Sequence, residues 1–389
     1  MGNLCSRRMT YVDSIDFNGE NDLIRAVKNK NFPACQMLVE HWKVDVNYAN
    51  TGKSYYEAYN QTALMWACNR NSLDIVKLLV ENGAEINYVS TVDGSPLREA
   101  VKNKNVEMVE YLIEHGADVN IGQGRYEYYG IENPLNMAMR STDLSKILLS
   151  NGAQTFCKDR LGFVHGLVGE AVKYNPDIEM IMLYLSYGAD INLGDHVETP
   201  LLMSLCWKKP EVATFLIRNG ADVNIVDGNG SSPLMRAIIM GYLEVAKMLI
   251  ELDYMDTEIA DVDGDTALTI AAKFYEYDLV ALLIRKASYR NLRKLMYIIK
   301  NEQTDNKDVY SLYFQALMKL YTDVNDMETS SKMEETRRVT MLTFNRVHAE
   351  MNDKNLIFEL SRNERKYHAY QKLICRKCCI MAKKKWCTC

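Results

Sequence analysis

The chain has 389 residues, of which 48% are hydrophobic and 25% are charged, with 7 Pro and 20 Gly. These values are ordinary for a folded protein and exclude a low-complexity chain. No run of 18 apolar residues occurs, and the first residues, MGNLCSRR, lack the apolar stretch of a secretory signal. Because the ten Cys are scattered rather than regularly spaced, we expect a cytoplasmic protein with reduced thiols at Cys35, Cys68, Cys157 and Cys206.

Charge is distributed unevenly along the chain. The formal net charge is −5, but residues 290–389 carry 20 Lys and Arg against 12 Asp and Glu, whereas the rest of the chain carries 26 against 39. From Arg362 onward there are nine basic residues and one acid, Glu364. An acidic body with a basic tail suggests two surfaces with different partners.

We interpret the first segment, residues 1–18, as a lipid anchor. Residues 1–6 (MGNLCS) match the N-myristoylation pattern, with Gly2 as the acceptor once Met1 is removed. Cys5 is placed for S-acylation, and Arg7 and Arg8 would face anionic headgroups. A single myristoyl chain binds a membrane only marginally, so these neighbours would supply the second signal. The alternative is a segment in which Gly2 has no role.

The best-formed unit of a repeating pattern is residues 93–120. Ser95 can cap a helix and Pro96 suits its first position. Apolar residues then follow at helical spacing on both sides of a polar break at 103–105, and Gly116 can end the second helix. The unit is therefore predicted to be helix–turn–helix. Neither helix is long enough to bury its apolar stripe alone, so neighbouring units are required.

Signals for helix starts and helix ends recur with the same period. The starts are Thr62, Ser95, Asn133, Thr199, Ser232 and Thr266, and the ends are Gly83, Gly116, Gly152, Gly188 and Gly220. Most gaps are 32–36 residues. Two independent signals with one period predict a solenoid of about eight repeats between residues 19 and 290. The fifth repeat has no clear start signal and a longer helical region over 163–187.

The repeats resemble the ankyrin repeat family, which has a period of 33 and a T-P-L-H-x-A motif. The segments 83–87, 116–120, 188–192 and 220–224 are similar to the family's G-A-D-V-N ending. The resemblance implies an all-α solenoid with β-hairpin-like loops and a protein-binding role. One departure is consistent, because the fourth motif position is never His. In the family that His helps to link successive loops, so its absence predicts lower stability. The residues found there are Met65, Arg98, Asn136, Leu202, Met235 and Thr269.

Two connections between repeats are oversized. From Asn47 to Thr62 the distance is 15 residues and from Asn120 to Asn133 it is 13, against seven or eight elsewhere. Insertions in a solenoid map to loops on one face, often the binding face, and Tyr is a typical interface anchor. We therefore predict partner-binding roles for the Tyr residues of these loops, with local packing as the alternative. They are Tyr48, Tyr55, Tyr56, Tyr59, Tyr126, Tyr128 and Tyr129.

Residues 265–389 contain neither Gly nor Pro, which predicts a helical tail. Leu292, Leu295, Met296 and Ile299 form one amphipathic stretch, and we expect it to cover the last repeat. We divide this part into a helical cap and tail, 291–370, and a basic Cys-rich segment, 371–389.

The basic Cys-rich segment has three interpretations. As a membrane anchor it would use its cations against anionic lipid and its Cys for acylation or prenylation. As a zinc site it would use Cys375, Cys378 or Cys379, Cys387 and Cys389, although the second pair is a less typical C-x-C. It could also be a solvated basic tail. The cations are Lys372, Arg376, Lys377, Lys383, Lys384 and Lys385, and the Cys are Cys375, Cys378, Cys379, Cys387 and Cys389.

Enzyme motifs are not evident. The chain lacks GxxxxGK[ST], GxSxG, HExxH and GxGxxG. Residues 261–265 (DVDGD) resemble the start of a calcium loop, but Thr266 and Ala272 stand where that loop needs Gly and Glu. We therefore expect no catalytic residues, no cofactor and no metal site in the repeats.

The sequence predicts a non-catalytic protein-interaction scaffold, bound peripherally to the cytoplasmic face of a membrane. Its partners would be proteins and an anionic membrane surface, and the lack of interleaved aromatic residues in the tail argues against nucleic acid. One alternative is a substrate-recognition adaptor of a ubiquitin ligase or a viral or microbial effector. Another is a metal-dependent regulator that uses a zinc-binding tail.

Overall fold

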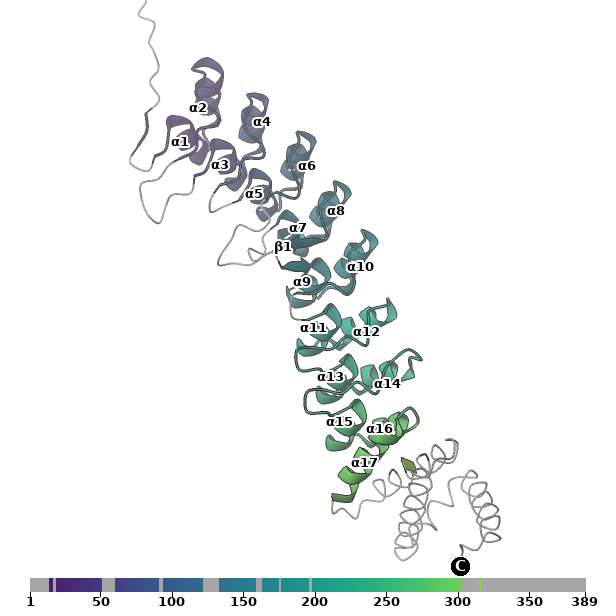
Figure 1. Cartoon of the computed structure of the whole chain (residues 1–389). Coiled ribbons are helices and arrows are strands. Elements are labelled where there is room, and N and C mark those ends of the chain that lie inside the picture. The colour runs from purple at the N-terminus through teal and green to yellow at the C-terminus, as the bar shows by residue number, and fades with distance from the viewer. Residues whose placement is uncertain are drawn as a thin grey trace, which may run out of the picture. The chain divides into compact units, whose positions relative to one another are not determined.

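In a computed structural model of the chain, residues 14–16, 19–50, 60–90, 94–121, 133–158, 163–174, 176–195 and 198–301 are described, together with 312, 315, 316 and 319. The chain divides into two compact units, Met1–Ala221 and Asp222–Cys389. Each unit is a succession of helix–turn–helix pairs (Figure 1).

Six pairs form the described part of the first unit. They are α1 (Asp22–Lys28) with α2 (Phe32–Gln36), α3 (Ala63–Asn69) with α4 (Leu73–Glu81), α5 (Pro96–Lys102) with α6 (Val106–Glu114), α7 (Pro134–Met137) with α8 (Thr142–Ser150), α9 (Leu167–Tyr174) with α10 (Ile178–Ser186), and α11 (Pro200–Cys206) with α12 (Pro210–Arg218). A π-helical turn, Met37–His41, continues α2, and a 3-10 turn, Ala138–Arg140, continues α7.

Two further pairs and a final helix form the described part of the second unit. They are α13 (Pro233–Ile239) with α14 (Leu243–Glu251), α15 (Ala267–Lys273) with α16 (Tyr277–Ile284), and α17 (Tyr289–Asn301). The predicted all-α repeat architecture is therefore confirmed, with eight helix pairs in the described residues.

The first helices begin where the sequence places caps. The side chains of Thr62, Ser95 and Ser232 each accept a hydrogen bond from the backbone N–H three residues on, over 3.3, 3.3 and 3.4 Å. Asn133 does the same over 2.6 Å. Each cap satisfies one of the N–H groups that have no partner inside the helix. In these four repeats local chemistry therefore marks where the first helix begins.

Stacking supplies the core that one pair lacks. In the first unit α3 packs against α1, α4 and α5, and in the second α15 packs against α13, α16 and α17. Leu64, Leu79, Leu97 and Leu112 are 0–1% exposed. Burying one such side chain contributes about 1.5–3 kcal/mol. Each repeat therefore depends on its neighbours, as expected for a repeat protein.

A ladder of Asn side chains links successive repeats. Asn87 donates to the carbonyl of Gly116 over 2.9 Å and accepts from the N–H of Asp118 over 2.8 Å. Asn47 and Asn120 bind the ends of the next repeat in the same way. Asn224 repeats the pattern in the second unit, although its partner carbonyl belongs to Tyr254 instead of a Gly. The ladder therefore links successive repeats, although the His of the T-P-L-H-x-A motif is absent and the Asn residues stand at a different position of the repeat.

The fifth repeat departs from the expected helical region over 163–187. Strand β1 (Phe156–Lys158) pairs antiparallel with β2 (Val164–Gly166), and two separate helices, α9 and α10, follow. Pro176 explains the break after Tyr174, because proline cannot continue a helix and disfavours helical geometry in the residue before it. Gly166 is required at the end of β2, where a Cβ would lie 1.9 Å from the carbonyl oxygen of Leu193.

One further helix follows the last described helix pair. Helix α17 packs against α15 and buries Leu292 and Leu295 completely. Glu258 occupies the position that Asn holds in other repeats, and it accepts bonds from the N–H of Ser288 and the amide of Asn291 over 2.8 and 2.7 Å. Within the part of the chain that the structure describes, no helix is both long and apolar enough to span a bilayer.

Candidate interaction surfaces

Most of the predicted site residues lie outside the described residues. These are Gly2, Cys5, Arg7 and Arg8 at the start, the Tyr residues 55, 56, 59, 126, 128 and 129 in the two long connections, and the Cys and cations of residues 371–389. Their proposed roles in lipidation, partner binding and membrane contact stay predictions.

Tyr48 is the one predicted partner-binding Tyr that the structure describes. It is half-buried, and its hydroxyl donates to the carbonyl of Gly19 over 2.9 Å. The long connection that follows is closed at its base, where the N–H of Gln61 donates to the Asn50 side chain over 2.6 Å and Ala49 pairs with Thr62. Tyr48 therefore holds the first repeat together, which is the local-packing alternative at this position.

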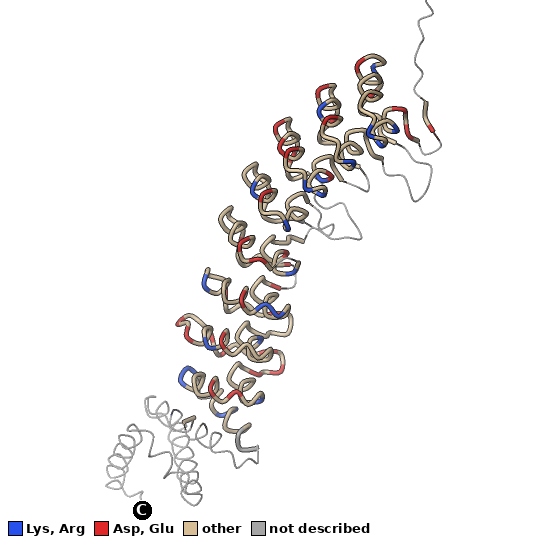
Figure 2. Tube along the Cα trace, turned by 180° about the vertical axis from the view of Figure 1, so that it is seen from behind, with Lys and Arg blue, Asp and Glu red and all other residues tan. Residues whose placement is uncertain are grey.

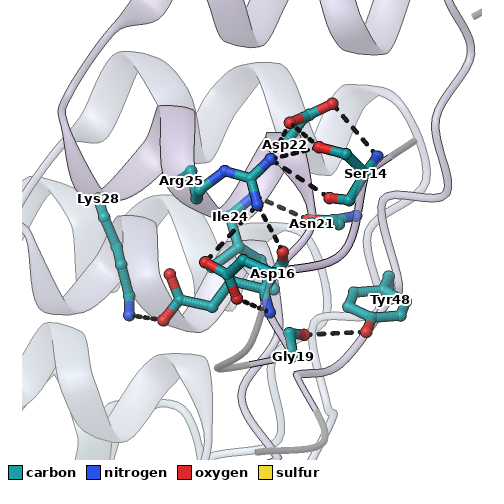
Figure 3. A network of polar contacts seen from close by, with 10 residues as sticks. Ser14, Asp16, Gly19, Asn21, Asp22, Ile24, Arg25, Lys28 and Tyr48 are labelled. Atoms are coloured by element: carbon teal, nitrogen blue, oxygen red, sulfur yellow. Dashed lines mark hydrogen bonds and ion pairs between the residues drawn. The ribbon is translucent and has the colours of Figure 1, made fainter. Parts of the chain in front are cut away.

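A polar network surrounds the beginning of α1 (Figure 3). The Arg25 guanidinium binds Asp22, donates to the Ser14 hydroxyl over 2.6 Å and donates to the carbonyl of Glu20 over 2.8 Å. The Asp16 carboxylate accepts from the N–H of Glu20 over 2.9 Å. These contacts neutralise Arg25 and hold Ser14, Asp16 and Glu20 against the first turns of α1.

The outward face of the early first helices presents an aromatic ring beside cations. The ammonium of Lys28 lies 3.8 Å from the ring centroid of Trp66, and the guanidinium of Arg70 lies 5.8 Å from it. Lys28 also pairs with Glu20. In the next repeat the amide of Asn69 donates to the buried carboxylate of Glu99 over 2.7 Å. Contacts between repeats thus hold these side chains in place.

Repeat five holds a buried charged group. The imidazole Nδ1 of His165 lies 3.8 Å from the Glu170 carboxylate, and both side chains are about nine-tenths buried. Burial raises the pKa of Glu170, an effect that Lys173 and His165 partly offset. Lys173 binds Asp195 over 2.8 Å. These groups connect the β1–β2 hairpin, α9 and the following loop, and we assign them a structural role.

In the second unit the pKa of a buried carboxylate, Asp227, is lowered, whereas that of Glu170 in the first unit is raised. Asp227 is 7% exposed and accepts bonds from the N–H groups of Asn229 and Ser231 and from Arg236. Burial would raise its pKa, but the hydrogen bonds outweigh burial and lower it. The loop at 261–265 is built alike, since Asp261 accepts from the N–H groups of Asp263 and Asp265. This loop is the hairpin tip that the sequence favours over a calcium site.

The described cysteines are not disulfide-bonded, and three of the four are buried. Burial raises the pKa of the Cys35 thiol to about 11 and that of Cys68 still further. Such thiols are poor nucleophiles at neutral pH. In the described part of the chain, no three His, Cys, Asp or Glu residues are grouped as a metal site would require.

Sequence reasoning missed Trp66 and the cations near it. The signal was available, because counting from each helix cap puts Lys28, Lys102 and Arg140 at one equivalent position and Arg70 one residue later in its repeat. That these side chains belong to one surface depends on the stacking of repeats, which periodicity alone does not show.

Comparison with known proteins identifies the repeats. The family model described as ankyrin repeats (3 copies) matches residues 4–90, 23–123 and 168–263, which together cover more than half of the chain. The human transient receptor potential cation channel subfamily A member 1 is 26% identical over 242 residues, which is 60% of this chain and 21% of the channel. A putative ankyrin repeat protein of fowlpox virus (strain NVSL) is 30% identical over 203 residues, 51% of this chain and 47% of the viral protein.

Human ankyrin repeat and SOCS box protein 6 is 29% identical over 151 residues, which is 36% of this chain and 35% of that protein. Among solved structures, the human ASB11 ankyrin repeat domain has a TM-score of 0.44 and 22% identity, covering 55% of this chain and 90% of that domain. The matched segments span less than half the length of each of these curated relatives.

Proposed function

Because the chain belongs to the ankyrin-repeat family, we propose that it is a non-catalytic scaffold that binds a protein partner while attached to the cytoplasmic face of a membrane. The carrying observation is the stack of helix pairs, whose outward face is ordered by contacts between repeats such as Asn69–Glu99 and Lys28–Trp66. An ordered surface binds with less loss of conformational entropy than one that must fold on its partner.

The membrane attachment is supported by the sequence of residues 1–6. Gly2 and Ser6 fit the myristoylation pattern, and Cys5, Arg7 and Arg8 supply candidates for a second membrane signal. The basic Cys-rich segment, residues 371–389, is a further candidate anchor.

Localisation of a fluorescent fusion at the C-terminus tests the attachment. Gly2→Ala should release the protein from membranes, and Cys5→Ser should weaken its retention. Asn3→Ala is the matched control, since it leaves acceptor Gly2 and Ser6 in place. If Gly2→Ala stays where the unmodified sequence goes, the myristoyl anchor is wrong.

Partner binding is tested by proximity labelling in cells with the full chain. Deletion of residues 51–59 should reduce the labelling of specific partners, whereas Trp66→Ala should reduce it only if the first-helix face contributes. If neither change alters the labelled proteins, both surfaces are excluded as the binding site.

The similarity to ankyrin repeat and SOCS box protein 6 favours a second candidate, an adaptor that brings substrates to a ubiquitin ligase. Recovery of ligase subunits with the full chain, lost on removal of residues 302–389, would support it. The zinc-dependent regulator is tested by metal analysis of the purified chain, because stoichiometric zinc would exclude lipidation of the same Cys.

A further inference from the structure

One edge of the first unit adjoins the first-helix face proposed for partner binding and shares Lys28 and Arg70 with it. It is the side where each first helix ends and each second helix begins, which we call the turn edge. The turn edge comprises residues 28–32, 69–73, 102–106, 140–142, 173–174, 176–178 and 206–210, and Asp177 is the one acid within these described ranges. Figure 2 shows Lys and Arg recurring in successive repeats beside the first helices. The exposed cations are Lys30, Arg70, Lys102, Lys104, Arg140 and Lys208.

Side-chain amides hold neighbouring turns in fixed register. Asn103 donates to the carbonyls of Cys68 and Asn69 over 2.9 and 3.0 Å. Asn105 donates to the side chain of Asn71 over 2.6 Å. Since packed helices lie roughly 8–10 Å apart, the cations form a row with about that spacing. The turn edge is therefore a preformed basic strip rather than a set of unrelated surface charges.

Helix dipoles account for only some of these cations. Lys102 and Arg140 lie in the last turn of a helix, where a positive charge is favourable. Lys30, Lys104 and Lys208 lie beyond the helix ends, with φ of 52°, 56° and 59°. A lysine costs free energy in this left-handed region, and the equivalent residues elsewhere include Asn71 and Gly241. Lysine in three such positions indicates that the charge itself is useful.

Exposed apolar side chains stand beside the cations. Tyr174 is 65% exposed, Trp207 is 52% exposed, and Phe32 and Val106 are each 36% exposed. Aromatic rings favour the boundary between lipid headgroups and acyl chains, and long cationic side chains reach from there to the headgroups. Binding of single-stranded nucleic acid would explain the charges and the aromatic rings, which can stack on bases, but not the exposed aliphatic side chain of Val106. A membrane explains both kinds of residue.

We propose that the turn edge of the first unit lies against an anionic membrane surface, with its cations facing lipid headgroups and Tyr174 and Trp207 at the interface. One exposed acid, Asp177, caps the second helix of the fifth repeat and opposes this charge locally. The other nearby acids are second residues of the following helices, and one of them, Glu107, is 3.4 Å from Lys77. They are Asp74, Glu107, Asp143, Glu179 and Glu211. The choice of a membrane over other polyanions rests on the proposed attachment.

Binding of the unlipidated full chain to phosphatidylcholine vesicles, with and without phosphatidylserine, tests the proposal. Lys383→Gln/Lys384→Gln/Lys385→Gln is present in every sample, which reduces binding by the tail. Arg70→Gln/Lys104→Gln/Arg140→Gln should weaken binding to the anionic vesicles about 100-fold, or about fivefold for each charge. The matched control, Lys43→Gln/Lys146→Gln/Arg218→Gln, removes three exposed charges outside the turn edge and should change binding less than about threefold.

The aromatic part of the proposal has its own measurement. Tyr174→Ala/Trp207→Ala should weaken binding while leaving its dependence on salt unchanged, because no charge is removed. All the changed side chains are exposed, so the repeats should remain folded, and circular dichroism melts of each variant check this.

Equal losses of binding in the edge and control variants, or no binding to anionic vesicles, would overturn the proposal. Tighter binding to a single-stranded RNA oligonucleotide than to vesicles would overturn it in favour of nucleic acid. Because the vesicle experiments use the unlipidated chain, none of these outcomes changes the result expected for Gly2→Ala in the localisation experiment.

Discussion

The two units differ at equivalent positions of their turns. In the first unit the turns expose cations such as Lys30 and Lys104 as well as Tyr174 and Trp207. In the described turns of the second unit the exposed residues at equivalent positions are mainly apolar: Ile239, Phe274 and Tyr275. The one cation at this position in the second unit, Lys273, pairs with Asp265.

Inward-facing positions do not differ in this way. The Asn ladder occurs in both units, at Asn87 and at Asn224, and Leu112 and Leu249 are both fully buried. The buried residues and the Asn ladder are therefore alike in the two units, while the exposed residues of the turns differ between them. We infer that the two units present different surfaces to their surroundings, and five changes test how far this comparison holds.

The largest effect is expected from Leu112→Ala and Leu249→Ala, which create cavities at equivalent core positions of the two units. Each should cost about 2–5 kcal/mol of unfolding free energy. Hydrogen exchange should accelerate mainly around α6 for the first and α14 for the second, because repeats contact only their neighbours. Equal acceleration throughout the chain for either variant would show that the units do not unfold separately.

Asp227→Asn removes a carboxylate whose pKa is lowered in the folded second unit. The loss should be about 1–3 kcal/mol at neutral pH, since a buried bond to a charged partner is broken. The stability that Asp227 provides is present above the unfolded pKa near 3.8 and is lost as pH falls through the lower folded pKa. Urea titrations at several pH values should show a shallower acid loss in the variant. An identical pH profile would contradict the assignment.

Asn87→Ala and Asn224→Ala break one rung of the ladder in each unit. Each rung has two hydrogen bonds at an exposed edge, so we expect about 1–2 kcal/mol per variant. Similar losses in thermal melts would confirm that the ladder serves both units alike. Asn82→Ala, which loses one bond within its own repeat, is a control for a local loss.

Glu170→Gln should leave the first unit as stable at neutral pH, or more stable by up to about 1 kcal/mol. Burial raises the pKa of Glu170, so its favourable contribution is present below about 4.5 and is lost as pH rises through the folded pKa. The variant should therefore lose less stability than the parent between acidic and neutral pH. This dependence is opposite in sign to that of Asp227, and denaturant titrations that find the same sign would refute the contrast.

The smallest effect on stability, below about 0.5 kcal/mol, is expected when the first unit's turn chemistry is placed on the second. Ile239→Lys/Phe274→Lys changes exposed side chains only. Binding to phosphatidylserine vesicles should increase by about fivefold for each added charge. No increase would show that turn charge alone does not make a membrane surface.

Local chemistry made most of the fold predictable from the sequence. Caps such as Ser95 and Ser232 and stops such as Gly116 act within a few residues, so each marks a helix end wherever the repeat lies. The prediction for the fifth repeat was wrong in detail. Its second strand ends where Gly166 lies close to Leu193, and these two residues are 27 positions apart in the sequence.

The candidate surfaces were less predictable. Tyr48 looked like an interface residue from its neighbours in sequence, yet it bonds Gly19, which is 29 residues away. The sequence does not distinguish Trp66 from other apolar residues of the repeats. Its contact with Lys28 of the preceding repeat is seen only in the structure. Such contacts join residues that the chain separates by a whole repeat.

The sequence alone determined the period, the helix ends and the residue types at each repeat position, because these follow from backbone hydrogen bonding and apolar spacing. Only the tertiary structure decided which of those positions share a surface. Stacking brings Asn69 beside Asn103 and Lys28 beside Trp66, and it places the lysines of separate turns along one edge. The physical reason is that one helix pair cannot bury its own apolar face. Repeats must therefore stack, and the stacking determines which side chains of different repeats lie together on a surface.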